Sequence, residues 1–436
     1  MLRPYYGSMR GIAAAALLSV SLAGCGGSSS SAPSADHSTP TCTSACTAQG
    51  VIPAAVSQDK QAGTPVDPAI VTADNTFGLN LLNTLLQEGA SSTGNTAIAP
   101  ISASLALQIT YNGAAGTTQQ AMAQTLQLGS LTTQQLNDDN AALQAALIDP
   151  DPQVQLNIAN SLWLKPGFSV APAFVQTDQN YYGATVGSLA GAPDNVNQWV
   201  SQETDGLIPK ILPPGDYSQD VAIIANAVYF KGAWASAFDP SQTTTKPFTL
   251  GDGSQTSVQM MNQANNLPYL RGSGFQAVRL PYGQGRLSML VVVPTAGTDI
   301  NTFVSGITAA TIDSWEGQMQ TIYGTVSLPR FSTFFASPLL QSLTSLGMGI
   351  AFDQNNADFS GIAPGTFVNQ VEHATMVEVD ETGTVAAGAT TVGITTSVAQ
   401  EPAFSVYADH PFFYAIRDDK TGELLFVGVL GNPNGG

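Results

Sequence analysis

Near the start of the folded part of the chain, hydrophobic residues follow a helical spacing. Four of them recur on one face of a helix, namely Phe77, Leu81, Leu82 and Leu85. A second helical stretch, 102–109, follows Pro100. The pattern therefore predicts helices early in the domain.

Further along the chain, continuous apolar runs predict buried strands. Segments 221–230 (VAIIANAVYF) and 287–293 (LSMLVVV) are short and rich in β-branched residues, which favours strands over helices. Segments 326–330, 376–379 and 424–429 are also strand-like. Because helices come first and strands later, without regular alternation, we expect an α+β fold.

Composition sets limits on the function. The 436 residues are 43% hydrophobic and only 10% charged, so most of the chain folds. With 13 Lys+Arg against 31 Asp+Glu, the net charge is -18, which argues against a nucleic-acid partner and against a basic membrane-binding surface. Three His and three Cys are too few for a histidine-rich metal site, so we predict no metal and no cofactor.

The first residues are typical of a secretory signal peptide. Arg3 and Arg10 precede an apolar stretch, 11–22, which is too short to span a bilayer as a helix. The stretch ends in LAGC, which resembles the lipobox of bacterial lipoproteins and implies cleavage before Cys25 and diacylation of its thiol. An ordinary signal peptide with a chance cysteine is the alternative. By resemblance to enterobacterial sorting, Gly26 is not the Asp that retains lipoproteins in the inner membrane, which favours the outer membrane of the cell envelope.

We therefore divide the chain into a lipoprotein signal peptide (1–24), a flexible tether rich in Ser, Thr and Pro (25–68) and one folded domain (69–436). The tether contains Cys42 and Cys46, which in an oxidising envelope form either a disulfide or two free thiols. The only membrane contact expected is the lipid anchor.

A hydrolase is disfavoured by the scarcity of histidine. A Ser-His-Asp triad needs a histidine base beside the nucleophile. His37 lies in the tether, which leaves His373 and His410, and no G-x-S-x-G elbow occurs. We predict that the protein is not an enzyme.

Segment 382–400 (TGTVAAGATTVGITTSVAQ) is the most informative stretch of the chain. It contains no charged residue and no proline, and it consists of small and β-branched types. A low-complexity loop is one interpretation, but uncharged β-prone segments are aggregation hazards that proteins normally interrupt with Lys or Pro. In an extended segment Thr384, Ala386, Gly388 and Thr390 share one face. Such a segment suits a strand that enters a sheet.

From about residue 72 to Pro433 the chain resembles the serpin family, in eight stretches that come in serpin order. They are 95–118, 160–186, 196–215, 226–248, 326–331, 345–362, 371–390 (VEHATMVEVDETGTVAAGAT) and 409–433 (DHPFFYAIRDDKTGELLFVGVLGNP). The resemblance implies the serpin fold: three β-sheets with eight or nine helices and an exposed reactive-centre loop.

The resemblance identifies 382–400 with that loop and its first part with the inhibitory hinge. The hinge residues are Glu381, Gly383, Thr384, Ala386, Ala387, Gly388 and Ala389. The implied function is serine protease inhibition as a suicide substrate, in which the cleaved loop inserts into the main sheet and traps the acyl-enzyme. The implied partner is thus a target serine protease in a covalent complex, and we expect a monomer.

The family's spacing from hinge to cleavage places the reactive bond between Ser397 and Val398, within a residue or two. Small side chains here suit elastase-like or subtilisin-like pockets. We also expect Thr384 to be exposed before cleavage and to turn inward on insertion, so that Thr384→Arg would leave the native stability almost unchanged.

Further residues match the family's sheet-opening regions. By resemblance, Ser102, Asn226 and His373 form the shutter, Trp234 is the breach tryptophan, and Arg330 pairs with Glu381. Plain core roles for His373 and Trp234 are the alternatives. The family usually has Ser where this chain has Ala99. Segment 131–149 has no Lys or Arg, so we expect no heparin binding.

Two other functions stay open. One is a non-inhibitory serpin that acts as a binding protein, and the other is cross-class inhibition of papain-like cysteine proteases. Non-inhibitory relatives tend to carry charged or bulky residues or Pro in the hinge, whereas 384–390 contains only small and β-branched residues here.

Overall fold

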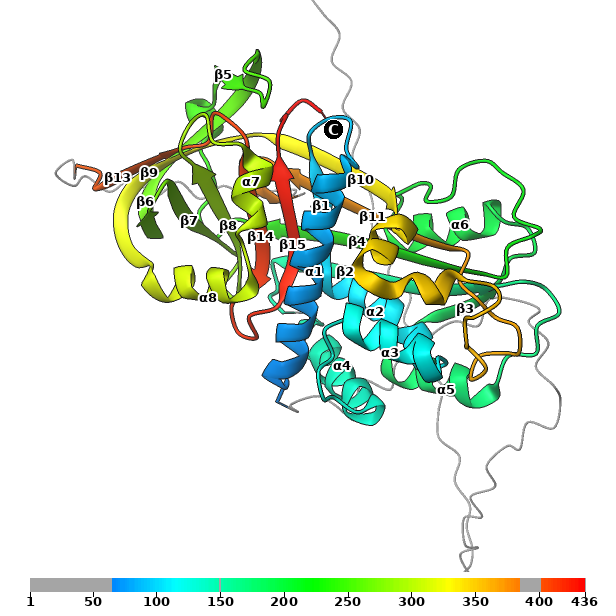
Figure 1. Ribbon diagram of the computed structural model, residues 1–436. Helices are drawn as coiled ribbons and strands as arrows, with labels where there is room; N and C mark the ends of the chain where they lie inside the picture. Colours follow the sequence, from blue (N-terminus) through cyan, green and yellow to red (C-terminus); the bar gives the residue numbers. More distant parts are fainter. Residues whose placement is uncertain (1–64, 149, 385–400, 436) are drawn as a thin grey trace, which may run out of the picture. The chain divides into compact units, whose positions relative to one another are not determined.

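Helices dominate the first half of the domain, as the hydrophobic spacing predicts (Figure 1). The computed structural model describes residues 65–148, 150–384 and 401–435. Within these residues the α-helices are α1 (Pro68–Glu88), α2 (Pro100–Tyr111), α3 (Gly116–Thr125), α4 (Thr133–Leu147), α5 (Pro172–Tyr181), α6 (Asp194–Glu203), α7 (Ile300–Ser305), α8 (Ala309–Gln318) and α9 (Leu340–Leu343). Single-turn segments are η2 (Pro240–Gln242), η3 (Thr344–Met348) and η4 (Gly349–Phe352).

The first predicted helix is α1, and its ends follow from local sequence. The Asp67 side chain accepts a hydrogen bond from the Ala69 N–H, and Pro68 occupies the first turn. Gly89 ends the helix in the left-handed conformation, φ 65°. The four apolar residues that predicted this helix are all buried.

Among the described residues one sheet, called the main sheet below, has six strands. Their order is β10 (Phe331–Pro338), β11 (Gln370–Val379), β12 (Gly383–Thr384), β4 (Ala222–Ala233), β2 (Val154–Leu164) and β3 (Thr185–Ser188). The short β12 lies between β11 and β4 at one end only. Over the rest of their length β11 and β4 pair directly and in parallel, from Gln370–Ile223 to Met376–Tyr229. In the main sheet a further strand has therefore begun between β11 and β4, and its described part is two residues long.

The other sheet has nine strands in the part of the chain that the structure describes. Its order is β1 (Thr96–Ile98), β15 (Leu424–Leu430), β14 (Phe412–Asp418), β8 (Leu287–Pro294), β7 (Phe275–Tyr282), β6 (Gln255–Gly272), β9 (Gln320–Pro329) and β13 (Phe404–Tyr407), with β5 (Thr244–Thr249) also paired to β6. The α+β class and the predicted strands are confirmed. Three separate sheets are not confirmed among the described residues, because the long β6 pairs with β9 over Met260–Tyr269 and with β7 over Tyr269–Gly272, so it joins the two halves into one sheet.

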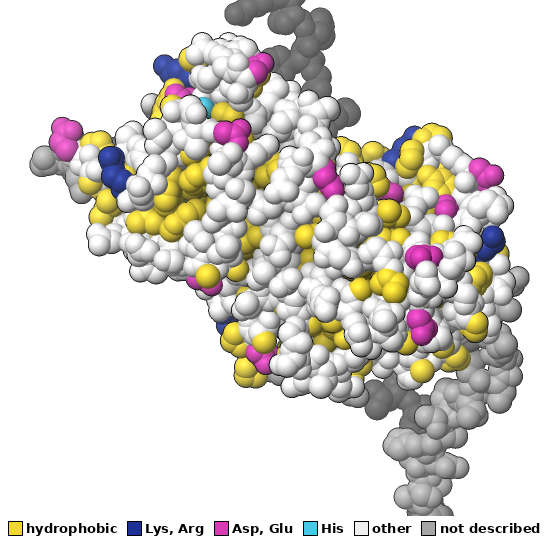
Figure 2. Space-filling model, in the orientation of Figure 1, with side chains coloured by type: hydrophobic (Ala, Val, Ile, Leu, Met, Phe, Trp, Pro, Cys, Tyr) yellow, Lys and Arg dark blue, Asp and Glu magenta, His cyan; other side chains and the backbone are white. Residues whose placement is uncertain are grey.

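Helix α2 is buried along its whole length and contacts strands of both sheets. Its buried polar side chains are hydrogen-bonded within the protein, and Ser104 and Gln108 donate to Asp74 of α1. The helix brings Ser102 against β4 from below the six-stranded sheet. No helix in the described ranges is long and apolar enough to span a membrane. On the face shown in Figure 2, Lys and Arg side chains stand singly rather than in a continuous patch.

Candidate functional site

The candidate site lies at the end of the six-stranded sheet where β12 enters. Gly383 and Thr384 pair antiparallel with Ala233 and Gly232 of β4, and Thr384 also pairs with Val379 of β11. Two further backbone bonds hold the segment just before β12: the Trp234 N–H donates to the Thr382 carbonyl (2.9 Å) and the Phe238 N–H to the Glu381 carbonyl (2.8 Å). The start of segment 382–400 is therefore part of the sheet already.

Gly383 is required at this point by a close backbone approach. A Cβ atom there would lie 2.0 Å from the Gly232 carbonyl oxygen and 2.7 Å from the Ala233 Cα, and the residue has φ +155°. Any side chain would push β12 off β4. The close approach of β12 to β4 thus explains why the hinge has a glycine at position 383.

The expectation that Thr384 is exposed is wrong. Its side chain is fully buried on the face of the sheet that Tyr282 occupies, and its hydroxyl forms a 2.7 Å hydrogen bond with the Tyr282 hydroxyl. Burial raises the pKa of Tyr282, so the phenol keeps its proton and remains a hydrogen-bonding partner. Sequence reasoning missed Tyr282, which lies 102 positions away from Thr384 in the chain.

Trp234 covers this pair. Its ring stacks on Tyr282 with centroids 4.4 Å apart and 11° between the planes, and its Nε1–H donates to the Asp380 carbonyl at 2.9 Å. A buried indole N–H needs an acceptor in any role, and here that acceptor lies at the base of the loop. The structure therefore places Trp234 directly under the entry of β12.

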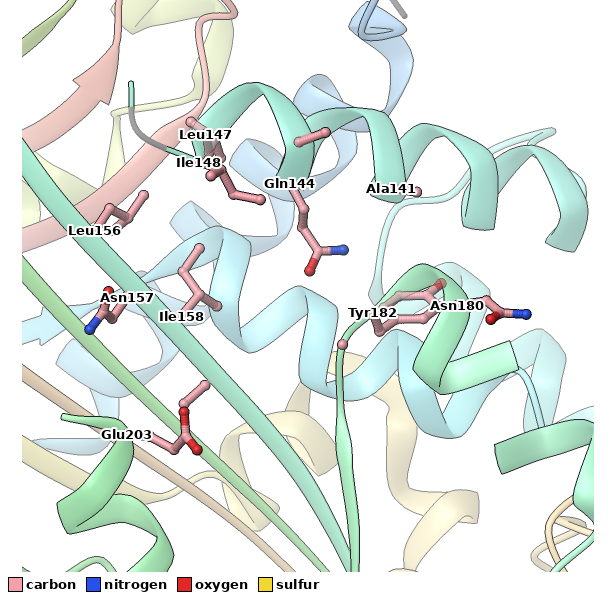
Figure 3. Close-up of a pocket in the computed structure, with 13 residues that line it drawn as sticks. Ala141, Gln144, Leu147, Ile148, Leu156, Asn157, Ile158, Asn180, Tyr182 and Glu203 are labelled. Carbon is pink, nitrogen blue, oxygen red and sulfur yellow. The ribbon is translucent and has the colours of Figure 1, made fainter. Parts of the chain in front are cut away.

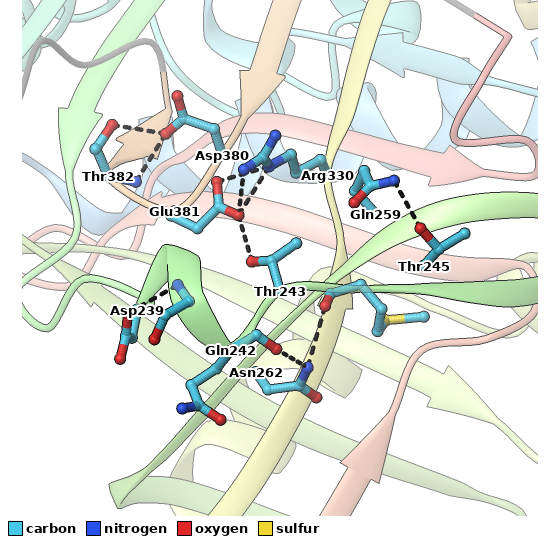
Figure 4. Close-up of polar contacts among 12 residues, drawn as sticks. Asp239, Gln242, Thr243, Thr245, Gln259, Asn262, Arg330, Asp380, Glu381 and Thr382 are labelled. Atoms are coloured by element: carbon cyan, nitrogen blue, oxygen red, sulfur yellow. Dashed lines mark hydrogen bonds and ion pairs between the residues drawn. The ribbon is translucent and has the colours of Figure 1, made fainter.

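The expected ion pair at the loop base is present (Figure 4). Arg330 Nε lies 2.8 and 2.7 Å from the two carboxylate oxygens of Glu381, and the Thr243 hydroxyl also donates to Glu381. The Glu381 side chain is 5% exposed, whereas that of Arg330 is 45% exposed. Burial alone would raise the pKa of Glu381, but the hydrogen bonds from Arg330 and Thr243 outweigh it and lower that pKa. Sequence reasoning missed Thr243.

Lower in the same sheet, a buried polar cluster joins β4 to β11. Asn226 Nδ2 donates to the Ser102 carbonyl (3.0 Å), to the Ser102 hydroxyl and to Asn160 Oδ1 (2.5 Å). Asn226 Oδ1 lies 2.5 Å from His373 Nδ1. The three residues expected at the shutter are thus in contact, and Asn160 is a fourth member that sequence reasoning missed.

The hydrogen bonds define the state of His373. Its Nε2 accepts from the backbone N–H of Ala99 (3.2 Å), so in the neutral ring the proton is on Nδ1 and is donated to Asn226. Burial lowers the pKa of His373 to about 3, which keeps the ring neutral. Ala99 lacks the hydroxyl usual in the family but still takes part through its backbone.

Several predicted residues lie outside the described ranges. They are Cys25, Cys42, Cys46, Ala386, Ala387, Gly388, Ala389, Ser397 and Val398. Across the part of the chain that is described, no three His, Cys, Asp or Glu side chains gather as a metal site requires.

Comparisons with known proteins agree with this geometry. The family model described as Serpin (serine protease inhibitor) matches residues 72–433. The leukocyte elastase inhibitor of Xenopus laevis is 32% identical, covering 79% of this chain and 94% of the relative. The human leukocyte elastase inhibitor is 31% identical over 83% of this chain and 99% of its own length. The solved structure of a thermophilic serpin, tengpin, in the native state has a TM-score of 0.79 at 28% identity, covering 87% of this chain and all of that one.

Proposed function

The chain belongs to the serpin family, and from this membership we propose that it inhibits a serine protease as a suicide substrate. The observation that supports the proposal is β12: the loop that carries the proposed reactive bond starts from a strand that is already paired on both sides. A freed loop can extend this strand without first forming a new sheet nucleus.

The chemistry belongs to the protease. Its serine oxygen attacks the carbonyl carbon of Ser397, the bond to the Val398 nitrogen breaks, and the Val398 amine leaves with a proton from the protease histidine. The ester formed would normally be hydrolysed. Instead, the loop extends β12 between β11 and β4, and about fifteen residues at ~3.3 Å each carry the protease roughly 50 Å. Displacement misaligns its catalytic groups, and deacylation stops.

Insertion exchanges one ladder for two. The direct β4–β11 pairing must open by one strand spacing, about 4.8 Å, which breaks the parallel ladder and the Asn226–His373 bond. The new strand then forms an antiparallel ladder with each neighbour, as β12 already does. The inserted state therefore has more backbone hydrogen bonds than the native state, which supplies the driving force.

We propose an elastase-like or subtilisin-like target. Residues 395–398 (TTSV) have small side chains, and no Lys or Arg occurs between Arg330 and Arg417, which disfavours trypsin-like enzymes. Two relatives at 31–32% identity are named leukocyte elastase inhibitors, and this supports the same preference.

We also propose that the protein is a monomeric lipoprotein of the bacterial cell envelope. Lipidation of Cys25 would anchor it, on the outer membrane, and the tether 25–68 would separate the inhibitor from the lipid surface.

The test is incubation of the purified protein with elastase-like, subtilisin-like, trypsin-like and papain-like proteases. We expect an SDS-stable complex with an elastase-like or subtilisin-like enzyme, and none when that protease lacks its catalytic serine. Cleavage without a complex would favour the non-inhibitory alternative, and a complex with a papain-like enzyme alone would favour the cross-class one.

A further inference from the structure

A cavity of about 350 Å³ lies away from the candidate site, between α4, the end of α5 and the edge of β2 (Figure 3). It shares no residue with the contacts around β12, and it meets the Asn226 cluster only at Ala159, whose carbonyl lies 3.5 Å from Asn226 Nδ2. Its volume falls in the range of small-molecule sites.

The cavity exists because β2 has a free edge there. Strand β3 pairs with β2 only over Ser161–Leu164, so among the described residues the earlier part of β2 has no neighbouring strand on this side. Small residues on the opposite wall, Ala141, Ala145 and Gly183, leave the space unfilled.

Four aliphatic side chains form the apolar part of the wall. They are Leu147 and Ile148 from the end of α4 and Leu156 and Ile158 from β2. In Figure 3 these side chains face one another across the cavity. Ile148 is 42% exposed, one of few large hydrophobic residues that the described chain leaves in contact with water. An apolar ligand would cover it.

The charge that lines the cavity is negative. Glu203 is the only charged residue among those that line it, and no hydrogen bond or ion pair reaches its carboxylate within the described residues. Glu203 is the last residue of α6, and the last turn of that helix contains no basic residue. The negative end of the helix dipole therefore adds to the carboxylate. Partial burial raises the pKa of Glu203, which a neighbouring cation would reverse.

We propose that this cavity binds a linear cationic amphiphile, with its alkyl chain between the aliphatic side chains of α4 and β2 and its amine beside Glu203. A fatty acid would place a second carboxylate against Glu203 and against the carboxyl end of α6. A neutral alcohol would gain the apolar contacts alone.

The test compares n-octylamine, n-octanol and n-octanoate below their aggregation concentrations, by calorimetry or by ligand-observed NMR on the full chain. We expect saturable binding of octylamine, binding of octanol weaker by about threefold to fivefold, and still weaker binding of octanoate. Removing one methylene from the amine should weaken binding about fourfold. No protease takes part, so this result is separate from the outcome for the proposed inhibition.

Matched variants locate the ligand. Ala145→Trp fills the cavity and should abolish binding, whereas Ala146→Trp, on the same helix but outside the lining, should not. Glu203→Gln should reduce octylamine to the affinity of octanol, whereas Glu401→Gln, at an exposed position elsewhere, should leave the preference unchanged. Melting temperatures show that each variant is folded. Equal binding of amine and octanoate, no saturable binding, or an amine preference that survives Glu203→Gln would overturn the proposal.

Discussion

Replacing Thr384 by arginine tests whether β12 holds the hinge in the sheet before cleavage. The threonine side chain is fully buried, and its hydroxyl contacts the Tyr282 hydroxyl at 2.7 Å. Arginine is too long to replace this hydrogen bond, and burying its unpaired guanidinium inside the sheet would cost several kcal/mol of folding free energy. The native state must therefore bury the charge or release the strand.

Release of β12 sets the upper limit of the loss. It removes the pairing of Gly383 and Thr384 with β4 and of Thr384 with β11, at about 1 kcal/mol for each hydrogen bond, and it takes the Thr384 partner away from Tyr282. Together these losses amount to roughly 3–5 kcal/mol. For a domain that spans 72–433 the unfolding entropy is about 0.75 kcal/mol per kelvin. We expect the melting temperature to fall by about 4–7 °C.

The assay combines thermal unfolding with titration of the target protease. Thr384→Arg should have a lowered melting temperature and should be cleaved without trapping the enzyme, because the first residue of the inserting strand resists burial. Thr321→Arg, at an exposed position of β9, is the matched control and should change neither. An unchanged melting temperature would refute the burial of Thr384, and trapping with wild-type stoichiometry would refute insertion through β12.

Four further outcomes follow from the Glu381–Arg330 ion pair, from the buried Asp74 of α1 and from the sequence. The lowered pKa of Glu381 beside Arg330 stabilises the folded state at neutral pH, and this stabilisation is lost on acidification below pH 4.5. The melting temperature of Glu381→Gln should therefore fall less on acidification than that of the wild type. Burial raises the pKa of Asp74 to about 7, so between about pH 3.8 and 7 the folded state holds a proton that the unfolded state has released. Wild-type stability therefore falls as the pH rises through this range, and Asp74→Asn should remove that fall. Melting curves across pH 3–8 measure both. Cys25→Ser should release the protein from the membrane fraction or block its processing, and unchanged fractionation would contradict lipidation. Ser397→Arg should recruit trypsin-like enzymes, with mass spectrometry locating the new amino terminus within two residues of position 398.

Local signals in the sequence were sufficient for the strands that form the interior. Segments 221–230 and 287–293 are apolar without interruption, and a strand covered on both faces needs this pattern, so β4 and β8 were predictable. The number of sheets was not. Whether two groups of strands form one sheet or two depends on the pairing of β6 with both β7 and β9, which no hydrophobic pattern encodes.

The partners of the candidate site were the harder part. Resemblance pointed to Ser102, Asn226 and His373, but Asn160 and Tyr282 enter only because β2 and β7 bring them beside residues far away in the chain. Strand alternation gives the face on which Thr384 lies, not whether the segment has entered the sheet. The exposure of Thr384 was mispredicted for this reason.

The Asn226–His373 bond also indicates what can open the sheet. It joins β4 and β11 at residues directly opposite each other. Protonation of His373 would turn Nε2 into a donor facing the Ala99 N–H and would place a charge between the strands, but burial lowers the pKa of His373 to about 3. At pH values well above 3 the ring is therefore neutral, and the Asn226–His373 bond is kept. Mild acidification therefore does not open the sheet, and in the mechanism proposed above the energy would come from the ladders that the cleaved loop forms as it extends β12.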